Sequence, residues 1–474
     1  MAFREYGNFD AVGLAGLVRN KQVTARELLD EAVARTAKVD PQINAVVVKH
    51  NDYAERQIER GLPDGPFAGV PFLLKDLDLL EGTRTTSGAT LLKDFVADHS
   101  GTLAQRFLAT GVSIFGKSAS PEFGLMPTTE SRLHGPTRNP WNPAHSSGGS
   151  SGGAAAAVAA RILPVAHASD GGGSIRIPAS ACGVFGMKPT RARNPLGPDR
   201  GEGWGGFSCG HVVSISVRDS AAMMDAIHGP EASSPYVAPP PERPFAQEVG
   251  RDPGKFRISF TDKSPYGDAI DPEIAAAVRD VAGLLADLGH HVEERAPPLA
   301  ADPAAVMTTI VGGNTALTVR LIEQRLGRSV TENDFEILTL AFAHNAQNTS
   351  ATDYVAAQLA AFQISRGLAT FFENRDVFLC PTLCSPPLRL GELDSMSRDL
   401  SHIPPVLRRY MPWTAMFNMS GQPAMSVPLA WNKAGLPLGM MFSAKFGDEA
   451  TLFRLAAQLE QARPWNNRLP PVCA

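Results

Sequence analysis

The amino-acid sequence predicts an α/β protein, in which short apolar strands alternate with amphipathic helices. Helical patterns separate the strand-like runs, and this alternation is typical of folds whose helices pack on a largely buried sheet. With 474 residues, 43% of them hydrophobic, the chain could form one large domain or two or three average ones. The strand-like runs are residues 45–48, 71–74, 112–115 and 377–379, and the clearest helical patterns are residues 274–288 and 449–461.

A capping box predicts the start of an early helix. Thr24 and Glu27 are spaced as N-cap and N3 residues, and apolar residues then recur at helical spacing through Val39. Pro41 follows directly, so the helix is expected to end before it.

Two serines bracketed by glycines form the most informative feature of the chain. The first cluster is Gly148-Gly149-Ser150-Ser151-Gly152-Gly153, and the second, Asp170-Gly171-Gly172-Gly173-Ser174, places Ser174 24 positions after Ser150. Glycine permits strained turns and close backbone approach, so each hydroxyl can stand beside free backbone N–H groups. A nucleophile and an oxyanion site need that arrangement.

Two ordinary explanations of such clusters fit less well. An isolated glycine–serine run is usually a flexible linker, but both clusters lie in apolar, alanine-rich sequence. Neither cluster carries the Gly-Lys-Ser/Thr ending or the G-x-G-x-x-G spacing of a phosphate-binding loop.

The stretch from Gly148 to Thr190 closely resembles the signature of the amidase signature family, whose catalytic set is two serines and an upstream lysine. Lys75 supplies that lysine in Gly69-Val70-Pro71-Phe72-Leu73-Leu74-Lys75-Asp76. The similarity covers nearly the whole chain and is weakest between about Glu231 and Asn374. Further similar landmarks are Asn139-Pro140-Trp141-Asn142, Ser216-Val217-Arg218-Asp219, Asn418-Met419-Ser420-Gly421-Gln422-Pro423-Ala424 and Gly435-Leu436-Pro437-Leu438-Gly439.

The resemblance implies a fold and an organisation. Family members form an α/β/α sandwich around a large mixed β-sheet. A single domain over residues 1–474 is therefore expected, with a signature core at about 65–220, a more variable helical region at about 231–374 and the rest of the core at 375–474.

The resemblance also implies roles for the three matched side chains. Ser174 is expected to be the nucleophile, Ser150 the proton relay and Lys75 the base. Lys75 can act as a base only as a neutral amine, which requires a buried site. The Gly149–Ser150 peptide bond is expected to be cis, as in family members.

Residues around the serines are expected to support them. The backbone N–H groups of Gly171, Gly172, Gly173 and Ser174 are expected to bind the oxyanion. Ser151 is expected to hydrogen-bond within its loop, Ser169 to orient the catalytic serines, and Asp170 to pair with Arg176. Gly171 replaces the family's usual threonine or isoleucine, which predicts a more flexible oxyanion loop and a wider pocket.

The substrate pocket is less well defined by the sequence. Leu125, Met126, Trp204 and Asn314 are the expected wall residues, and residues 197–210 are either a lid or an ordinary surface loop. The overall pattern is most similar to 6-aminohexanoate cyclic dimer hydrolases and aryl acylamidases. This similarity suggests a small uncharged amide, lactam, anilide or carbamate.

Two other functions remain open at this point. One is the glutamine-hydrolysing amidotransferase component of a tRNA-charging complex, and the other is a binding protein with a relict site. Labelling of Ser174 would exclude the relict site, and independent hydrolysis of simple amides would argue against the amidotransferase.

Other residues that could carry chemistry are expected to be structural. His167 lies too close in sequence to Asp170 and Ser174 for a typical triad, and Lys117 and Lys188 lack an adjacent glycine-bracketed serine. Cys380 and Cys384 have no second pair with which to bind zinc. No metal and no cofactor are expected.

Composition excludes several partners. The net charge of −4 shows no bias toward nucleic acid or anionic membranes. Neither a run of about 18 uncharged apolar residues nor a secretory signal is apparent, so no membrane span is expected. Five cysteines suggest reduced thiols and a cytoplasmic location. A small amide is the expected partner, and homodimerisation is left open.

Overall fold

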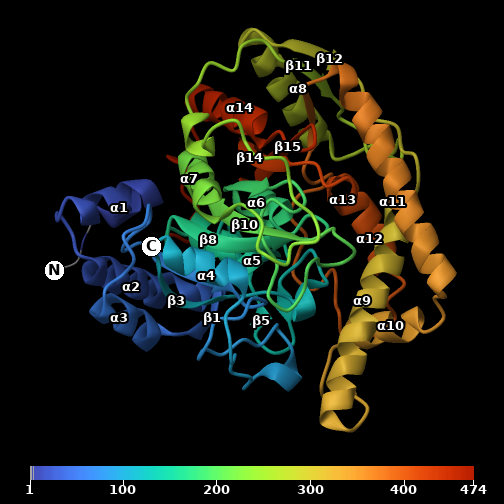
Figure 1. Cartoon of the computed structure of the whole chain (residues 1–474). Helices are drawn as coiled ribbons and strands as arrows, with labels where there is room; N and C mark the ends of the chain where they lie inside the picture. The colour runs from blue at the N-terminus through green and yellow to red at the C-terminus, as the bar shows by residue number, and fades with distance from the viewer. Residues whose placement is uncertain (1–2, 4) are drawn as a thin grey trace.

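The computed structural model describes residue 3 and residues 5–474, which form a mixed α/β structure around a large sheet (Figure 1). The eight strands of this sheet pair in the order β12-β11-β13-β15-β14-β9-β10-β8. Strand β11 is parallel to β12 and β13, and the other pairs are antiparallel. In that order, the strands are His291–Glu294, Arg257–Phe260, Val377–Pro381, Pro437–Ala444, Ala424–Trp431, Phe185–Lys188, Cys209–Ser214 and Val165–Asp170.

A three-stranded sheet lies beside the β8 edge of the large sheet. It has the order β1-β3-β2, with β1 antiparallel and β2 parallel to β3. Strand β2 packs next to β8, which brings the ends of these two strands together. Its strands are β1 Val46–Lys49, β2 Pro71–Lys75 and β3 Ser113–Ser118, and two small sheets pair β4 Glu130–Ser131 with β5 Gly135–Pro136 and β6 Arg138–Asn139 with β7 Asn142–Ser146.

Helices cover both faces of the large sheet. Successive side chains of a strand point to opposite faces, and β15 shows this directly, since Met440 and Phe442 pack with α8 and α14 whereas Met441 packs with α11 and α13. The predicted α/β/α sandwich is therefore confirmed. The helices are α1 Ala11–Arg19, α2 Ala25–Ile43, α3 Asn51–Arg60, α4 Thr102–Ala109, α5 Gly152–Ala159, α6 Arg176–Cys182, α7 Val217–Ile227, α8 Pro272–Asp287, α9 Pro303–Leu326, α10 Ile337–Ala346, α11 Ala351–Phe371, α12 Ile403–Tyr410, α13 Thr414–Met419 and α14 Glu449–Ala462, with 3₁₀ turns η1 Tyr6–Asn8, η2 Thr90–Leu92, η3 Glu122–Gly124, η4 Phe245–Gln247 and η5 Phe372–Asn374.

The predicted strands and helices form, with small differences at their ends. The capping box at Thr24 is present, with hydrogen bonds in both directions to Glu27. The prediction that helix α2 ends before Pro41 is wrong, because the helix continues to Ile43. Ile43 is fully buried, so its packing supports the last turn despite the N–H group that proline lacks.

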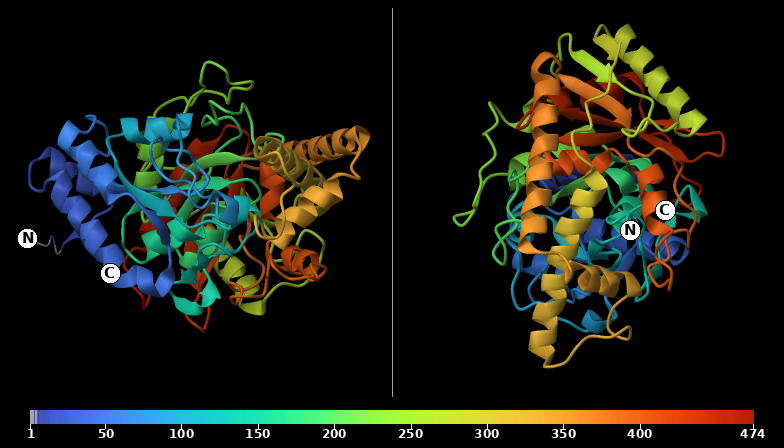
Figure 2. Two further views of the ribbon diagram at one scale, coloured as in Figure 1. Left: turned by 90° about the horizontal axis from the view of Figure 1, so that it is seen from below. Right: turned by 90° about the vertical axis from the view of Figure 1, so that its right-hand side faces the viewer.

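Helices α9, α10 and α11 stand at the end of the molecule opposite to α1, α2 and α3 (Figures 1 and 2). Among the described residues, α9 alone is long and apolar enough to cross a membrane by length and composition, with a mean hydropathy of 1.3 and 33% of that stretch buried. This criterion is weak for a single helix. Helix α9 packs against α10 and α11, so its apolar side chains contribute to the folded protein.

Helix α5 follows the first serine cluster and is buried along its whole length. Its eight residues are glycine, alanine and valine, and all of them are buried. Small side chains let α5 approach β8, β10 and α6 closely. The first serine cluster therefore begins a helix in the centre of the protein.

Candidate active site

Three chain segments converge at the candidate site. Strand β2 ends at Lys75, the first serine cluster leads into α5, and β8 ends at Asp170 just before the second cluster and α6. The contact between β2 and β8 places Lys75 beside β8 and the second serine cluster. The backbone N–H of Lys75 donates to Nδ1 of His167, in β8, at 3.2 Å.

The side chain of Lys75 is completely buried and lies against two serine hydroxyls. Its Nζ is 2.7 Å from Oγ of Ser150 and 3.1 Å from Oγ of Ser169. Burial lowers the pKa of Lys75 from 10.5 to about 7, although the carboxylates of Asp78 and Asp170 oppose the shift. A substantial fraction of neutral amine is therefore available at neutral pH.

Ser150 follows a cis peptide bond from Gly149, as the resemblance predicts. The space around Gly149 admits no side chain, because an added Cβ would lie 2.7 Å from the backbone N and O of Thr128. A Cβ on Gly124 would lie 3.2 Å from the Oγ of Ser150. The missing side chain at Gly124 thus leaves room for the serine hydroxyl.

Ser174 lies near Ser150 without a direct hydrogen bond between their hydroxyls. Both residues line one cavity, and the backbone N–H of Ser151 donates to the carbonyl of Ser174 at 3.3 Å. Among the hydrogen bonds of the described residues, none involves Oγ of Ser174. The hydroxyl of Ser174 therefore faces the cavity uncommitted, while Lys75 and Ser150 are already in contact.

The backbone N–H groups of the second cluster divide into two sets. Those of Gly171, Gly172 and Ser174 have no acceptor among the described residues. The N–H of Gly173 instead donates to Oδ1 of Asp170 at 2.7 Å. The prediction that Gly173 supplies an oxyanion donor is therefore wrong for this geometry, because the carboxylate already occupies that N–H. Gly173 has φ 139° and a Cβ there would lie 2.7 Å from Oγ1 of Thr414, so its need for glycine is steric.

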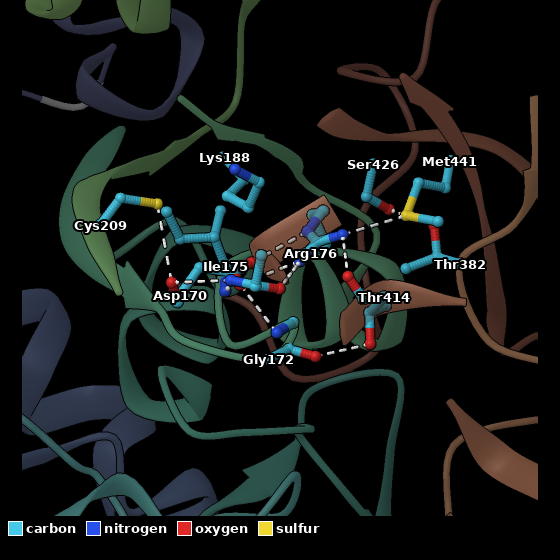
Figure 3. Close-up of polar contacts among 12 residues, drawn as sticks. Asp170, Gly172, Ile175, Arg176, Lys188, Cys209, Thr382, Thr414, Ser426 and Met441 are labelled. Carbon is cyan, nitrogen blue, oxygen red and sulfur yellow. Dashed lines mark hydrogen bonds and ion pairs between the residues drawn. The ribbon is translucent and has the colours of Figure 1, made fainter. Parts of the chain in front are cut away.

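Asp170 and Arg176 form the expected ion pair, which fixes this loop (Figure 3). Both side chains are fully buried, and the Arg176 Nε lies 2.9 Å from Asp170 Oδ2. Burial alone would raise the pKa of Asp170, but the neighbouring guanidinium and Lys188 outweigh it and lower the pKa to about 2. Asn418 bonds to both members of the pair.

Asn418 and Thr414 are supporting residues that the sequence interpretation did not assign. The Arg176 guanidinium donates to the carbonyl of Thr414 at 2.9 Å, and Oγ1 of Thr414 donates to the carbonyl of Gly172 at 2.6 Å. Both contacts appear in Figure 3. Asn418 begins the segment Asn418–Ala424, which resembles the family, and this similarity could have identified it as a supporting residue. Nothing in the local sequence marks Thr414.

Ser151 and Ser169 hold the two clusters against each other. The Oγ of Ser151 donates to the carbonyl of Ser169 and accepts from its N–H, both at 3.2 Å. The prediction that Ser151 bonds within its own loop is therefore wrong, because its hydroxyl pairs with the backbone of β8. Ser169 presents its own hydroxyl to Lys75.

The alternative chemical groups are buried, and both lysines are hydrogen-bonded to backbone carbonyls. His167 is fully buried, and burial lowers its pKa to about 4. Lys117 donates to the carbonyl of Asp78, and Lys188 to that of Pro189 at 2.7 Å. In the described part of the chain, no group of three or more histidine, cysteine or acidic side chains is placed to hold a metal ion.

A cavity of about 710 Å³ opens from the serines. Its lining includes the predicted wall residues Leu125, Trp204 and Asn314, but not Met126. The placement of Met126 in the pocket was wrong, because its side chain is buried in an apolar cluster with Ile177 and Ala181. The predicted loop 197–210 supplies several wall residues, including Trp204.

Trp204 occupies the space that Gly171 leaves free. A Cβ on Gly171 would lie 2.6 Å from Cε3 and 2.7 Å from Cζ3 of the indole. The prediction that the missing side chain widens the pocket is therefore wrong, because the aromatic ring fills the vacated volume.

Comparisons with known proteins identify the family to which the sequence and the fold belong. A sequence profile described as Amidase matches residues 27–453. A 6-aminohexanoate-cyclic-dimer hydrolase of Pseudomonas sp. (strain NK87) is 38% identical over 479 residues, covering 98% of this chain and 96% of the relative. The solved structure of a 6-aminohexanoate cyclic dimer hydrolase matches with a TM-score of 0.94 at 37% identity, covering 98% of this chain and 99% of that chain. A bacterial aryl acylamidase described as an amidase signature enzyme matches with a TM-score of 0.87 at 28% identity, covering 97% of each chain. These are the two kinds of relative that the sequence pattern resembles, so that prediction is confirmed.

Proposed function

The chain belongs to the amidase family and is a hydrolase of amide C–N bonds, and from that premise we propose that it cleaves a small uncharged amide through an acyl-enzyme on Ser174. Lys75 is the base and Ser150 the relay between base and nucleophile. The contact of 2.7 Å between Lys75 Nζ and Ser150 Oγ, made in a fully buried site, is the observation that carries the proposal.

In the first half of the reaction, the neutral amine of Lys75 accepts the proton of Ser150, and Ser150 accepts the proton of Ser174 as its Oγ attacks the carbonyl carbon. Rotation of the two serine hydroxyls toward each other completes the chain when substrate is bound. The N–H groups of Gly171, Gly172 and Ser174 stabilise the oxyanion, and one such donor typically contributes about 3 kcal/mol.

In the second half, the C–N bond breaks and Ser150 gives its proton to the departing amine. Lys75 then returns a proton to Ser150. Water next attacks the acyl-enzyme and gives its proton to Ser150, which passes its own proton to Lys75. As the tetrahedral intermediate collapses, the proton returns from Lys75 through Ser150 to Ser174, which is released with the carboxylic acid product. Atoms and charges balance with water as the co-substrate.

The relatives support a choice of substrate class. The named relatives act on a cyclic amide dimer and on aryl acyl amides, which are both uncharged at the reacting bond. We therefore propose a linear amide, lactam, anilide or carbamate as substrate. The glutamine-hydrolysing component of a tRNA-charging complex is the alternative, and it predicts turnover of glutamine only together with a partner protein.

A panel of purified-enzyme assays tests the proposal. Short aliphatic amides, anilides, cyclic amides, carbamates and glutamine are compared for wild type and for Lys75→Ala, Ser150→Ala and Ser174→Ala. We expect hydrolysis without a partner, unchanged activity in EDTA, and turnover abolished by the first and third variants. Ser150→Ala is expected to be less severe, and full activity in it would exclude the relay.

A fluorophosphonate probe separates a failed substrate choice from a failed mechanism. We expect it to label Ser174 in the wild type, and labelling without turnover would mean that the panel lacks the right amide. No labelling at all would refute the acyl-enzyme.

We also propose a cytoplasmic location for the enzyme, on the basis of its cysteines. All five cysteines carry free thiols, as is usual in a reducing compartment. Fractionation of the source cells tests this location.

A further inference from the structure

The cavity continues past the serines along one face of α9. The α9 residues that line it recur every three or four positions, which is the spacing of a single helical face. They include Asn314, Thr315, Thr318, Val319, Ile322 and Leu326. At about 1.5 Å per residue, this face runs for roughly 18 Å from Asn314 to Leu326.

The first half of α9 lies at the candidate active site. The methyl group of Met307 is 3.1 Å from the position that a Cβ on Gly172 would take. Ile310 approaches Gly205, beside Trp204, in the same way at 3.4 Å. The later residues of α9 therefore lead away from the serines.

The outer half of the cavity has apolar walls on both sides. Val319 and Ile322 of α9 belong to one apolar cluster with Leu91 and Leu92 of η2. All four side chains also line the cavity. The backbone N–H of Leu91 donates to the carbonyl of Asp334 at 3.1 Å, which ties η2 to the chain that follows α9. At its far end the lining becomes charged, with Asp94 and Arg325.

The apolar half begins beside Ser150. A Cβ on Gly124 would lie 3.2 Å from the Ser150 Oγ, so the η3 turn borders this hydroxyl. Phe123, the preceding residue, lines the cavity and packs in the same apolar cluster as Leu91 and Ile322. In the proposed reaction Ser150 protonates the leaving nitrogen, so this wall lies on the amine side of the amide.

We propose that the outer half of the cavity binds a long, unbranched, uncharged chain carried by the leaving amine of the substrate. The proposal rests on the proposed function, since it needs Ser174 to define the reacting carbonyl and Ser150 the leaving nitrogen. A zigzag of 1.5 Å bonds advances roughly 1.25 Å per bond, so 18 Å accommodates about fourteen bonds. A chain of ten to twelve carbons, about 12–15 Å long, therefore extends along the face from Asn314, occupies the apolar outer half and ends before Arg325.

Chain-length series of two kinds test the proposal. One series is the N-alkyl acetamides with unbranched alkyl groups of two to twelve carbons, and the other is the N-methyl amides of fatty acids of the same lengths. We expect kcat/KM to rise about two- to fourfold per added methylene in the first series, to level off at ten to twelve carbons, and to change little in the second.

The variant Ile322→Asn tests the wall itself. We expect it to flatten the rise beyond about six carbons while leaving kcat/KM for N-ethylacetamide unchanged. Leu321→Asn is the matched control, because Leu321 is the preceding residue of α9, is 55% exposed and is not part of the cavity lining. It should leave both series unchanged.

The outcomes separate this proposal from the proposed function. Loss of all amide hydrolysis and of Ser174 labelling would refute the function, and the inference with it. Hydrolysis of short amides with no dependence on N-alkyl length would overturn the inference alone. A rise confined to the acyl series would also overturn it, because the chain would then lie on the other side of the carbonyl.

Discussion

The fit of Gly171 against Trp204 predicts that Gly171→Ala lowers activity. A methyl group there would lie 2.6 Å and 2.7 Å from two indole carbons and 3.0 Å from Oγ of Ser208. Ordinary carbon–carbon contacts begin near 3.5 Å. Since an indole ring is rigid, either the ring or the oxyanion loop must shift by about 1 Å.

The size of the effect follows from the cost of overpacking. An extra methyl group in a filled space typically costs about 1–3 kcal/mol. If the oxyanion loop yields, the N–H groups of Gly171 and Gly172 move relative to the carbonyl, and kcat/KM falls about 5- to 150-fold. Trp204 already has a positive φ of 52°, so its backbone has little freedom to give way.

A double-mutant cycle measures this coupling. We would compare kcat/KM for a short amide in wild type, Gly171→Ala, Trp204→Ala and the double variant. Trp204→Ala is expected to relieve the effect of the methyl group, so that Gly171→Ala lowers kcat/KM less in the Trp204→Ala background than in the wild type. Gly283→Ala serves as a control, because no atom lies within 4 Å of its added Cβ. Wild-type activity in Gly171→Ala, or equal effects with and without Trp204, would refute the reasoning.

Three further predictions concern the buried charges. Because Lys75 accepts a proton only when neutral and has a pKa of about 7, kcat/KM should fall about tenfold per pH unit below 7 and be flat above it; a pH–rate profile without this limb contradicts the assignment. Between pH 10.5 and 7 the unfolded chain binds the Lys75 proton and the folded protein does not, so wild type loses stability as pH falls. The free energy of unfolding of Lys75→Met should therefore rise relative to that of the wild type as pH falls, by up to about 1.4 kcal/mol per pH unit over that range. Urea denaturation of both proteins at pH 7 and 9 measures this difference. Asp170→Asn should lower the free energy of unfolding by about 3–5 kcal/mol and remove most of the activity. The double variant Asp170→Asn with Arg176→Met should lose less stability than the two single variants together, as measured by tryptophan fluorescence in urea.

Local sequence was sufficient to predict the main elements, whereas the family resemblance predicted the central contacts. The capping box at Thr24 and the apolar runs gave the helices and strands nearly in place, because those signals act over a few residues. The contact of Lys75 with Ser150 and the pair of Asp170 with Arg176 came from the resemblance, which is strong at those positions.

The incorrect details depend on contacts between distant segments. Pro41 lies inside α2 because Ile43 is buried by the rest of the fold. The N–H of Gly173 is taken up by the nearby carboxylate of Asp170, but the partner of that carboxylate, Arg176, is itself held by the distant residues Thr414 and Asn418. Trp204 reaches Gly171 from a loop more than thirty residues later, so no pattern around Gly171 could have revealed it. The division of the chain as one domain remains a prediction.

The complete burial of α5 has a consequence for how this enzyme can diversify. A close-packed interior helix of small side chains tolerates almost no larger residue. The Ser150 hydroxyl just before this helix is therefore held by a part of the protein in which few substitutions are tolerated. Helix α9, by contrast, lines the cavity on one face and exposes Leu317, Leu321 and Leu326 at the surface. Laboratory evolution toward new amides should therefore accumulate changes in α9 and leave the alanine helix untouched.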